Sequence, residues 1–201
     1  MSQAENYLIK HGIVSNPNSE SAKQIMKISP TLQHHNYSKP SDLIGKLWKE
    51  YQALSKKSIP GQVFELIISI LLVREGLTPF YRSAEVSFVP NVRFDFLLYT
   101  EIEGPIVLSA KTSLRERYKQ ADLEGQALKA VYRRAKSHLI TLDSTESAVV
   151  AKKIDNGNIL GLDTSIVATS NDFNKLISDL KKHSLIEAPT FPALQSGFLI
   201  K

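Results

Sequence analysis

The 201-residue chain has no cysteine, and it has no long uninterrupted hydrophobic run. The absence of cysteine excludes a disulfide framework, thiolate-bound zinc or iron–sulfur clusters, and a cysteine nucleophile. The most apolar stretch, residues 66–73, is interrupted by Ser69 and is far shorter than the ~20 residues that a membrane helix needs. The first twelve residues lack the basic and hydrophobic regions of a signal peptide. We therefore expect a reduced, cytoplasmic protein with no membrane partner.

Motifs of several large enzyme classes are also missing. The sequence has no Gly-x-x-x-x-Gly-Lys-Ser/Thr phosphate loop, no Gly-x-Gly-x-x-Gly fingerprint and no Gly-x-Ser-x-Gly elbow. Nucleotide-driven and serine-hydrolase chemistry therefore lack support, and we expect no nucleotide cofactor. Lysine and arginine outnumber the acidic residues by 25 to 20, for a formal net charge of +5. A basic chain suits a polyanionic partner, although many basic proteins bind no nucleic acid.

The hydrophobic pattern divides a chain of single-domain length (residues 1–201) into a helical N-terminal part (1–58) and an α/β core (59–201). Short helices are expected around residues 7–9, from Ser19 or Ser21 to near Pro30, and from a cap at Ser41. The loop between the last two carries His34-His35, whose role the sequence does not indicate. A helix beginning at Pro60-Gly61 is apolar on all sides, which predicts that it is fully buried.

After Gly76 the period shortens to two, which predicts an antiparallel meander of strands over 84–89, 92–99 and 106–111. A helix follows over about 119–135, with Leu123, Ala127, Ala130 and Val131 as its expected inward stripe. The remaining pattern predicts strands over 137–142, 159–162 and 166–168 and helices over 145–154 and 171–181. This order favours a mixed β-sheet flanked by helices.

Two charged residues stand out in the predicted strands. Asp95 lies in the apolar run Phe94–Leu98, where a buried and unpaired acid would be costly, and Lys111 ends the next apolar strand. Each has an ordinary alternative, because strand acids and strand-terminal lysines are often simply solvated. A tight turn joins the two strands, so Asp95 and Lys111 are expected side by side. This is the layout of the Asp…(Asp/Glu)-x-Lys nucleases, except that Ser109 replaces the second acid.

Glu124 lies 13 positions after Lys111, on the following helix, from which a carboxylate can reach the end of the strand. The pattern Ser109-Ala110-Lys111…Glu124 resembles the Ser-x-Lys…Glu variant of the type II restriction endonucleases, a subgroup that includes EcoRII and NgoMIV. The resemblance covers about residues 60–143. It implies a restriction-endonuclease-like fold, in which residues 59–201 are the catalytic core, and Mg²⁺ held by Asp95, Glu124 and the carbonyl of Ala110. It also implies that Lys111 assists the attacking water and that Ser109 supports the site.

Arg115-Glu116-Arg117 follows closely and is similar to the element with which this subgroup reads CC:GG sites. Arginine can bind guanine O6 and N7 with two hydrogen bonds, and glutamate can accept from cytosine N4. The alternative is a solvated charge run at a helix start. Glu65, the lone charge of the apolar helix, has an implied supporting role near the metal. It is equally well explained as a buried ion pair with Arg82 or Arg93.

We therefore expect a Mg²⁺-dependent endonuclease that cuts double-stranded DNA at a palindromic site containing CC:GG and leaves 5′-phosphates. A two-fold site requires a homodimer, and the sequence leaves open whether dimers pair into tetramers. Two alternatives remain. One is a DNA-binding module with this fold and no catalysis. The other is a repair or junction nuclease that does not need Arg115-Glu116-Arg117 to read bases.

Overall fold

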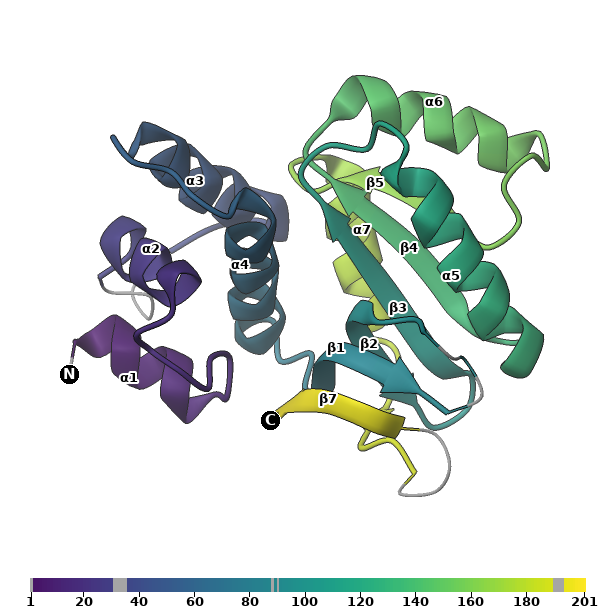
Figure 1. Cartoon of the computed structure of the whole chain (residues 1–201), viewed down its shortest axis with the longest axis horizontal. Helices are drawn as coiled ribbons and strands as arrows, with labels where there is room; N and C mark the ends of the chain where they lie inside the picture. Colours follow the sequence, from purple (N-terminus) through teal and green to yellow (C-terminus); the bar gives the residue numbers. More distant parts are fainter. Residues whose placement is uncertain (1, 31–35, 88, 90, 190–193) are drawn as a thin grey trace.

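The computed structural model describes residues 2–30, 36–87, 89, 91–189 and 194–201, so His34 and His35 lie outside the described part. Four helices form the N-terminal third of the chain (Figure 1). They are α1 (Gln3–Lys10), α2 (Glu20–Ile28), α3 (Pro40–Ala53) and α4 (Pro60–Arg74). The expected helical character of the first 60 residues is therefore confirmed.

The rest of the chain forms a mixed sheet with further helices. Its strands are β1 (Phe80–Val86), β2 (Phe94–Thr100), β3 (Gly104–Lys111), β4 (Lys136–Thr141), β5 (Thr164–Val167), β6 (Leu185–Ile186) and β7 (Leu194–Ile200). The helices are α5 (Arg117–Val131), α6 (Ser144–Asp155) and α7 (Asn171–Leu180). The main strand order is β5-β4-β3-β2-β1-β7, and the short β6 pairs with the end of β2.

The sheet is antiparallel on one side and parallel on the other. β1, β2 and β3 form the expected antiparallel meander, and β7 adds to β1 in the antiparallel sense. β4 and β5 run parallel to β3, because α5 and α6 return the chain before each of them. β3 therefore lies where the two halves of the sheet meet, and six of its eight residues are buried. The expectation of a mixed α/β sheet with flanking helices is confirmed.

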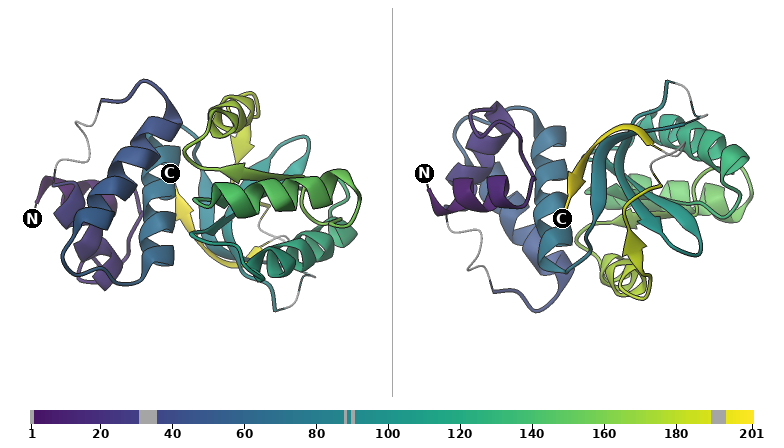
Figure 2. Two further views of the ribbon diagram at one scale, coloured as in Figure 1. Left: turned by 90° about the horizontal axis from the view of Figure 1, so that it is seen from above. Right: turned by 90° about the horizontal axis from the view of Figure 1, so that it is seen from below.

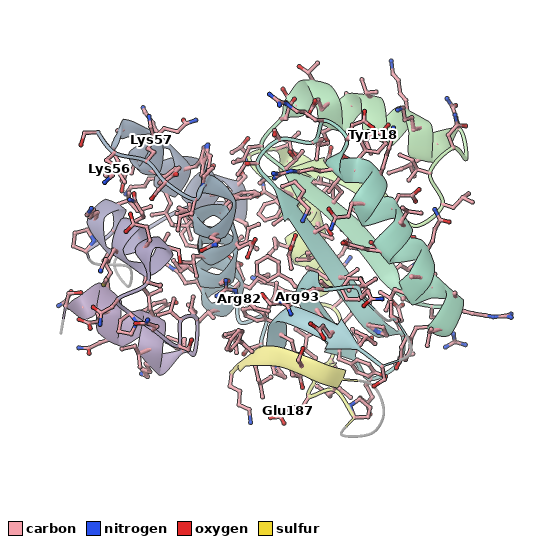
Figure 3. The ribbon with its side chains drawn as sticks, in the orientation of Figure 1. Lys56, Lys57, Arg82, Arg93, Tyr118 and Glu187 are labelled. Atoms are coloured by element: carbon pink, nitrogen blue, oxygen red, sulfur yellow. The ribbon has the colours of Figure 1, made fainter. Side chains whose placement is uncertain are left out.

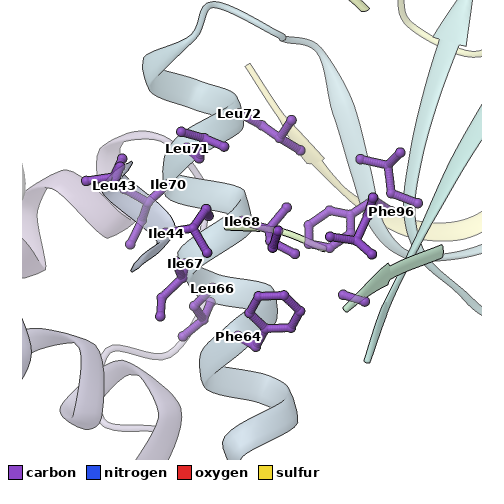
Figure 4. Close-up of a cluster of buried hydrophobic side chains, with 14 of the residues drawn as sticks. Leu43, Ile44, Phe64, Leu66, Ile67, Ile68, Ile70, Leu71, Leu72 and Phe96 are labelled. Atoms are coloured by element: carbon purple, nitrogen blue, oxygen red, sulfur yellow. The ribbon is translucent and has the colours of Figure 1, made fainter. Parts of the chain in front are cut away.

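Helix α4 connects the N-terminal helices to the sheet. Nine of its residues from Val63 to Leu72 are buried, as its all-round apolar sequence predicts. Figure 4 shows its side chains reaching towards Leu43 and Ile44 of α3 on one side and towards Phe96 of β2 on the other. The same core continues to α7, whereas α5 and α6 cover the opposite face of the sheet (Figure 2).

Several local expectations are wrong. Lys39, and not Ser41, is the N-cap of α3, since Pro40 occupies the first helical position and the Ser41 N–H donates to Asn174 Oδ1 at 2.9 Å. Residues 159–162 form no strand. β1 starts at Phe80 because its first residues pair with β7, a strand that no pattern in the sequence predicted.

No helix in the described part of the chain is long and apolar enough to cross a membrane.

Burial of α4 predicts a large stability cost for truncating its core side chains. Ile68 is 0% exposed. Ile68→Ala is expected to lower the free energy of unfolding by about 2–5 kcal/mol, because it removes buried methyl groups and leaves a cavity. Val149→Ala, at a position that is 51% exposed, should change it by less than about 0.5 kcal/mol. Urea denaturation measures both, and equal stabilities of the two variants would contradict the placement of α4.

Candidate active site

The pairing of β2 with β3 ends at Phe96 and Leu108, near the start of β2 and the end of β3. Asp95 precedes Phe96 in β2 and therefore lies just outside the paired region. Beyond that point the Asp95 carboxylate accepts the backbone N–H of Ala110 at 2.8 Å, in place of a strand acceptor. The same oxygen, Oδ2, accepts from Lys111 Nζ at 2.7 Å. The side chains of Lys111 and Asp95 are 14% and 17% exposed, so this is a largely desolvated ion pair.

Glu65 approaches this pair from α4. Its Oε2 lies 3.8 Å from Arg82 Nη2 on β1, which is too long for a hydrogen bond. Burial and the nearby Asp95 raise the pKa of Glu65 to about 7, although Arg82 and Lys111 act in the opposite direction. Of the two arginines considered as partners, Arg82 is the one in contact. Arg93 instead pairs with Glu85 at 2.6 Å.

Glu124 approaches from α5, on the other face of the sheet. Burial raises its pKa, and its charge interacts with those of Lys111 and Asp95. Its Oε1 accepts from Gln120 Nε2 at 2.7 Å, one turn earlier in the helix. The charges of Lys111 and Asp95 therefore interact with that of Glu65 on α4 and with that of Glu124 on α5.

The expected inward stripe of α5 is wrong except at Ala127, which is half-buried against the core. Leu123 is 66% exposed and Val131 is 39% exposed, and the buried residues are Ala121, Gly125 and Leu128. The reason is the close approach of α5 to the loop before β5. A Cβ on Gly125 or on Gly161 would overlap the backbone of the other segment. This contact sets the rotation of α5, and hence the side on which Glu124 lies.

Asp122 fastens the same contact, although the sequence gave no signal for this role. Its Oδ1 accepts the backbone N–H groups of Leu160 at 3.0 Å and Gly161 at 2.6 Å. Asp122 therefore holds the loop against the helix that carries Glu124.

Ser109 and Ala110, the other two residues of the Ser-x-Lys segment, are buried in β3. Ser109 is 3% exposed and lies on the same side of β3 as Lys111, since alternate strand residues share a face. Its hydroxyl makes no hydrogen bond within the described residues. Ala110 contributes its N–H to Asp95, as described above.

Arg115, Glu116 and Arg117 are exposed at the start of α5. Glu116, the acid of the Arg115-Glu116-Arg117 segment, forms an ion pair with Lys119. Arg115 has a left-handed backbone with φ of 37°. The Leu114 and Arg115 N–H groups both donate to Glu146 Oε2, at 2.7 and 2.8 Å.

Glu146 therefore fixes this turn, a role that sequence reasoning missed. The available signal was the helix-start pattern Asp143-x-x-Glu146, in which the Asp143 side chain accepts the Glu146 N–H at 2.9 Å.

The donor set of this site suits a hard divalent cation. Mg²⁺ commonly uses one or two carboxylates and completes its shell with water. Asp95 Oδ1 accepts no hydrogen bond from the described residues, and Glu124 is a second acid whose charge interacts with that of Asp95. The described residues contain no cluster of three or more His, Asp or Glu side chains arranged to hold a metal. The chemistry thus fits a cation held by two carboxylates, and not one enclosed by a full set of side-chain ligands.

Comparison with known proteins gives one structural match. No protein-family model and no curated protein matches the chain by sequence. Among solved structures, the chain is similar to the restriction endonuclease PspGI in complex with its substrate DNA, with a TM-score of 0.50. The match covers 93% of this chain and 83% of that one, at 17% sequence identity. The fold is that of a restriction endonuclease. At this identity the likeness establishes the fold alone, and the chemistry depends on this chain's own residues.

The raised pKa of Glu65 predicts how stability depends on pH in the metal-free protein. Between its ordinary value of 4.5 and about 7, the folded chain holds a proton that the unfolded chain has lost. The contribution of neutral Glu65 to the free energy of unfolding is therefore fully present below pH 4.5 and is lost as the pH rises through about 7. Glu65→Gln stays neutral, so its stability relative to the wild type should rise by roughly 2–3 kcal/mol between pH 4.5 and pH 8.

Urea denaturation in EDTA across this pH range measures the difference. Glu101→Gln, at an exposed position, is the control and should follow the wild type at every pH. Parallel curves for Glu65→Gln and the wild type would contradict the burial of an ionisable group at this position.

Proposed function

We propose that the chain is a Mg²⁺-dependent endonuclease that cuts double-stranded DNA at a specific palindromic site and leaves 5′-phosphates. The observation that carries the proposal is the desolvated Asp95–Lys111 pair at the diverging ends of β2 and β3. Carboxylates from two helices interact electrostatically with it, in a fold shared with a restriction endonuclease that was solved with DNA. Such a set of acids around one lysine suits phosphodiester hydrolysis.

Asp95, Glu124 and the carbonyl of Ala110 would hold the cation. When bound, Mg²⁺ would supply a Lewis acid at the scissile phosphate. Lys111 is held by Asp95, where its ammonium group can orient the attacking water and offset negative charge on the phosphate. Glu65 would support the site from α4. Ser109 would do so from within β3.

A palindromic site is read by two-fold protein symmetry, so we propose that the active form is a homodimer. Arg115, Glu116 and Arg117 would contact G·C pairs in the major groove, which gives a target with CC on one strand and GG on the other.

Changes in the charge pair should abolish cleavage and spare DNA binding. Asp95→Asn and Lys111→Ala are expected to reduce the cleavage rate by at least about 100-fold, because each removes a charge from the site of phosphate hydrolysis. Binding to target DNA in Ca²⁺ should change little, because phosphate contacts elsewhere supply most of the affinity. Plasmid cleavage with Mg²⁺ and a gel-shift assay measure the two effects. Wild-type cleavage by either variant would contradict the proposal.

Glu124 is the acid proposed to replace the one missing at Ser109. Glu124→Gln should raise the Mg²⁺ concentration needed for half-maximal cleavage and lower the maximal rate, since Mg²⁺ would lose a carboxylate ligand. Glu116→Gln and Glu101→Gln, at two exposed acids, should leave the Mg²⁺ dependence unchanged. Loss of Mg²⁺ response in Glu116→Gln with normal Glu124→Gln would move the metal site to the start of α5.

The two exposed arginines are proposed to read guanine. Arg115→Ala or Arg117→Ala should lose roughly 1–3 kcal/mol of discrimination against a changed G·C pair. Arg134→Ala, an exposed control beyond the far end of α5, should weaken all sequences alike. Competition gel shifts measure the ratio of the affinities for the target site and for a site with one G·C pair changed.

Mapping of plasmid ends separates the alternatives. Discrete fragments that share CC:GG support a restriction enzyme. Nicks at junctions or damaged sites support a repair nuclease. Such an enzyme would not need Glu116 to read a base, which agrees with the ion pair between Glu116 and Lys119. Binding without cleavage at any Mg²⁺ concentration supports a non-catalytic module.

A further inference from the structure

A pocket of about 280 Å³ lies between the N-terminal segment and the β1–β7 side of the sheet. Its wall is formed by the loop after α1, by the start of α2, and by residues of α4, β1 and β7. Arg82 on β1 lines it and lies at the junction of α4 with the sheet (Figure 3). The pocket is lined by neither Asp95 nor Lys111.

The lining of this pocket is polar and carries a single sign of charge. Among the described residues that line the pocket, Arg82 carries a charge and none is an aspartate or glutamate. Ser15, Asn16, Gln62 and Ser83 add hydroxyl and amide groups. Asn16 Oδ1 already accepts the Asn18 N–H at 2.9 Å, which leaves its amide nitrogen as a donor. Neutral donors around one guanidinium are the chemistry that recognises an oxyanion.

Arg82 has fewer acceptors than its donors require. Its Nη1 donates to the backbone carbonyl of Ile13 at 2.5 Å, and its Nη2 is 3.8 Å from Glu65 Oε2. Its Nε is fully buried and has no hydrogen-bond partner among the described residues. A buried donor without an acceptor costs free energy. Because Nε has no accessible surface, a ligand in the pocket would contact the guanidinium through its Nη groups.

The backbone of β1 is distorted at the same place. Ser83 has φ of 49°, in the left-handed region, and the pairing of β1 with β7 shifts register between Arg82 and Glu85. Successive residues of a regular strand point to opposite faces, yet Arg82 and Ser83 both line this pocket. The bulge thus brings two neighbouring polar residues to one cavity, and strain of this kind concentrates at functional sites.

We propose that this pocket binds a phosphate group. Arg82 supplies the positive charge, and Ser15, Asn16, Gln62 and Ser83 supply neutral hydrogen bonds. The phosphate is either one carried by a nucleic-acid strand or the free ion. The proposal does not depend on nuclease activity, because the pocket and the Asp95–Lys111 pair use different residues.

The first test measures binding of inorganic phosphate to the full-length chain in EDTA, by calorimetric titration at constant ionic strength. Gln62 is exposed in the first turn of α4, where an acidic residue suits the helix and should not disturb folding. Gln62→Glu should weaken phosphate binding about tenfold by repulsion, and Gln62→Lys should strengthen it. Gln52→Glu makes the same charge change at an exposed position of α3 outside the pocket and should bind like the wild type.

The second test distinguishes the sources of the phosphate. A 12-nucleotide single strand is titrated with and without a 5′-phosphate. A gain in affinity from the 5′-phosphate that disappears in Gln62→Glu indicates a terminal phosphate. Equal binding of both strands, weakened in Gln62→Glu, indicates a backbone phosphate. Binding of inorganic phosphate alone with the same sensitivity indicates the free ion.

Two results would overturn the proposal. One is the absence of phosphate binding by the wild-type chain. The other is equal phosphate affinity in Gln62→Glu and wild type, above all if Lys111→Ala abolishes the binding. Cleavage is not part of either readout, so an inactive but phosphate-binding protein would refute the nuclease proposal and leave this one standing.

Discussion

The contact between Lys111 and Asp95 is the interaction on which the candidate site depends. Asp95 lies where β2 and β3 separate, and its carboxylate takes both the Ala110 N–H and the Lys111 ammonium. One side chain thus fixes the end of a strand and the position of a charge. Water is largely excluded from this pair, so each charge lowers the free-energy cost of burying the other. Removing either side chain would leave a buried charge without a partner.

The charges around this pair are arranged so that acid is in excess. Glu65 and Glu124 come from helices on opposite faces of the sheet, and burial is the first cause of the raised pKa of each. A cation bound between Asp95 and Glu124 would favour the ionised form of the latter. An excess of acid around one lysine is compatible with the metal and phosphate chemistry proposed for this site.

Arg82 connects this site to the N-terminal helices. It lies 3.8 Å from Glu65, it donates to the carbonyl of Ile13 in the loop after α1, and it lines the pocket proposed to bind phosphate. The N-terminal segment thereby contacts a residue that acts electrostatically on both Glu65 and Asp95. A phosphate bound at Arg82 would compete with Glu65 for the same guanidinium, so occupancy of the pocket and the charge state of the site would be coupled.

The sequence by itself determined the features that depend on local pattern. The apolar α4, the antiparallel β1–β3 meander and the adjacency of Asp95 and Lys111 follow from hydrophobic period and a short turn. Tertiary structure decided what depends on distant segments. The rotation of α5 is set by Gly125 against Gly161, and β7 pairs with β1 from the opposite end of the chain. The turn at Arg115 is held by Glu146, and Arg82 is the partner of Glu65. Each of these is a contact between residues far apart in sequence, which no periodicity encodes.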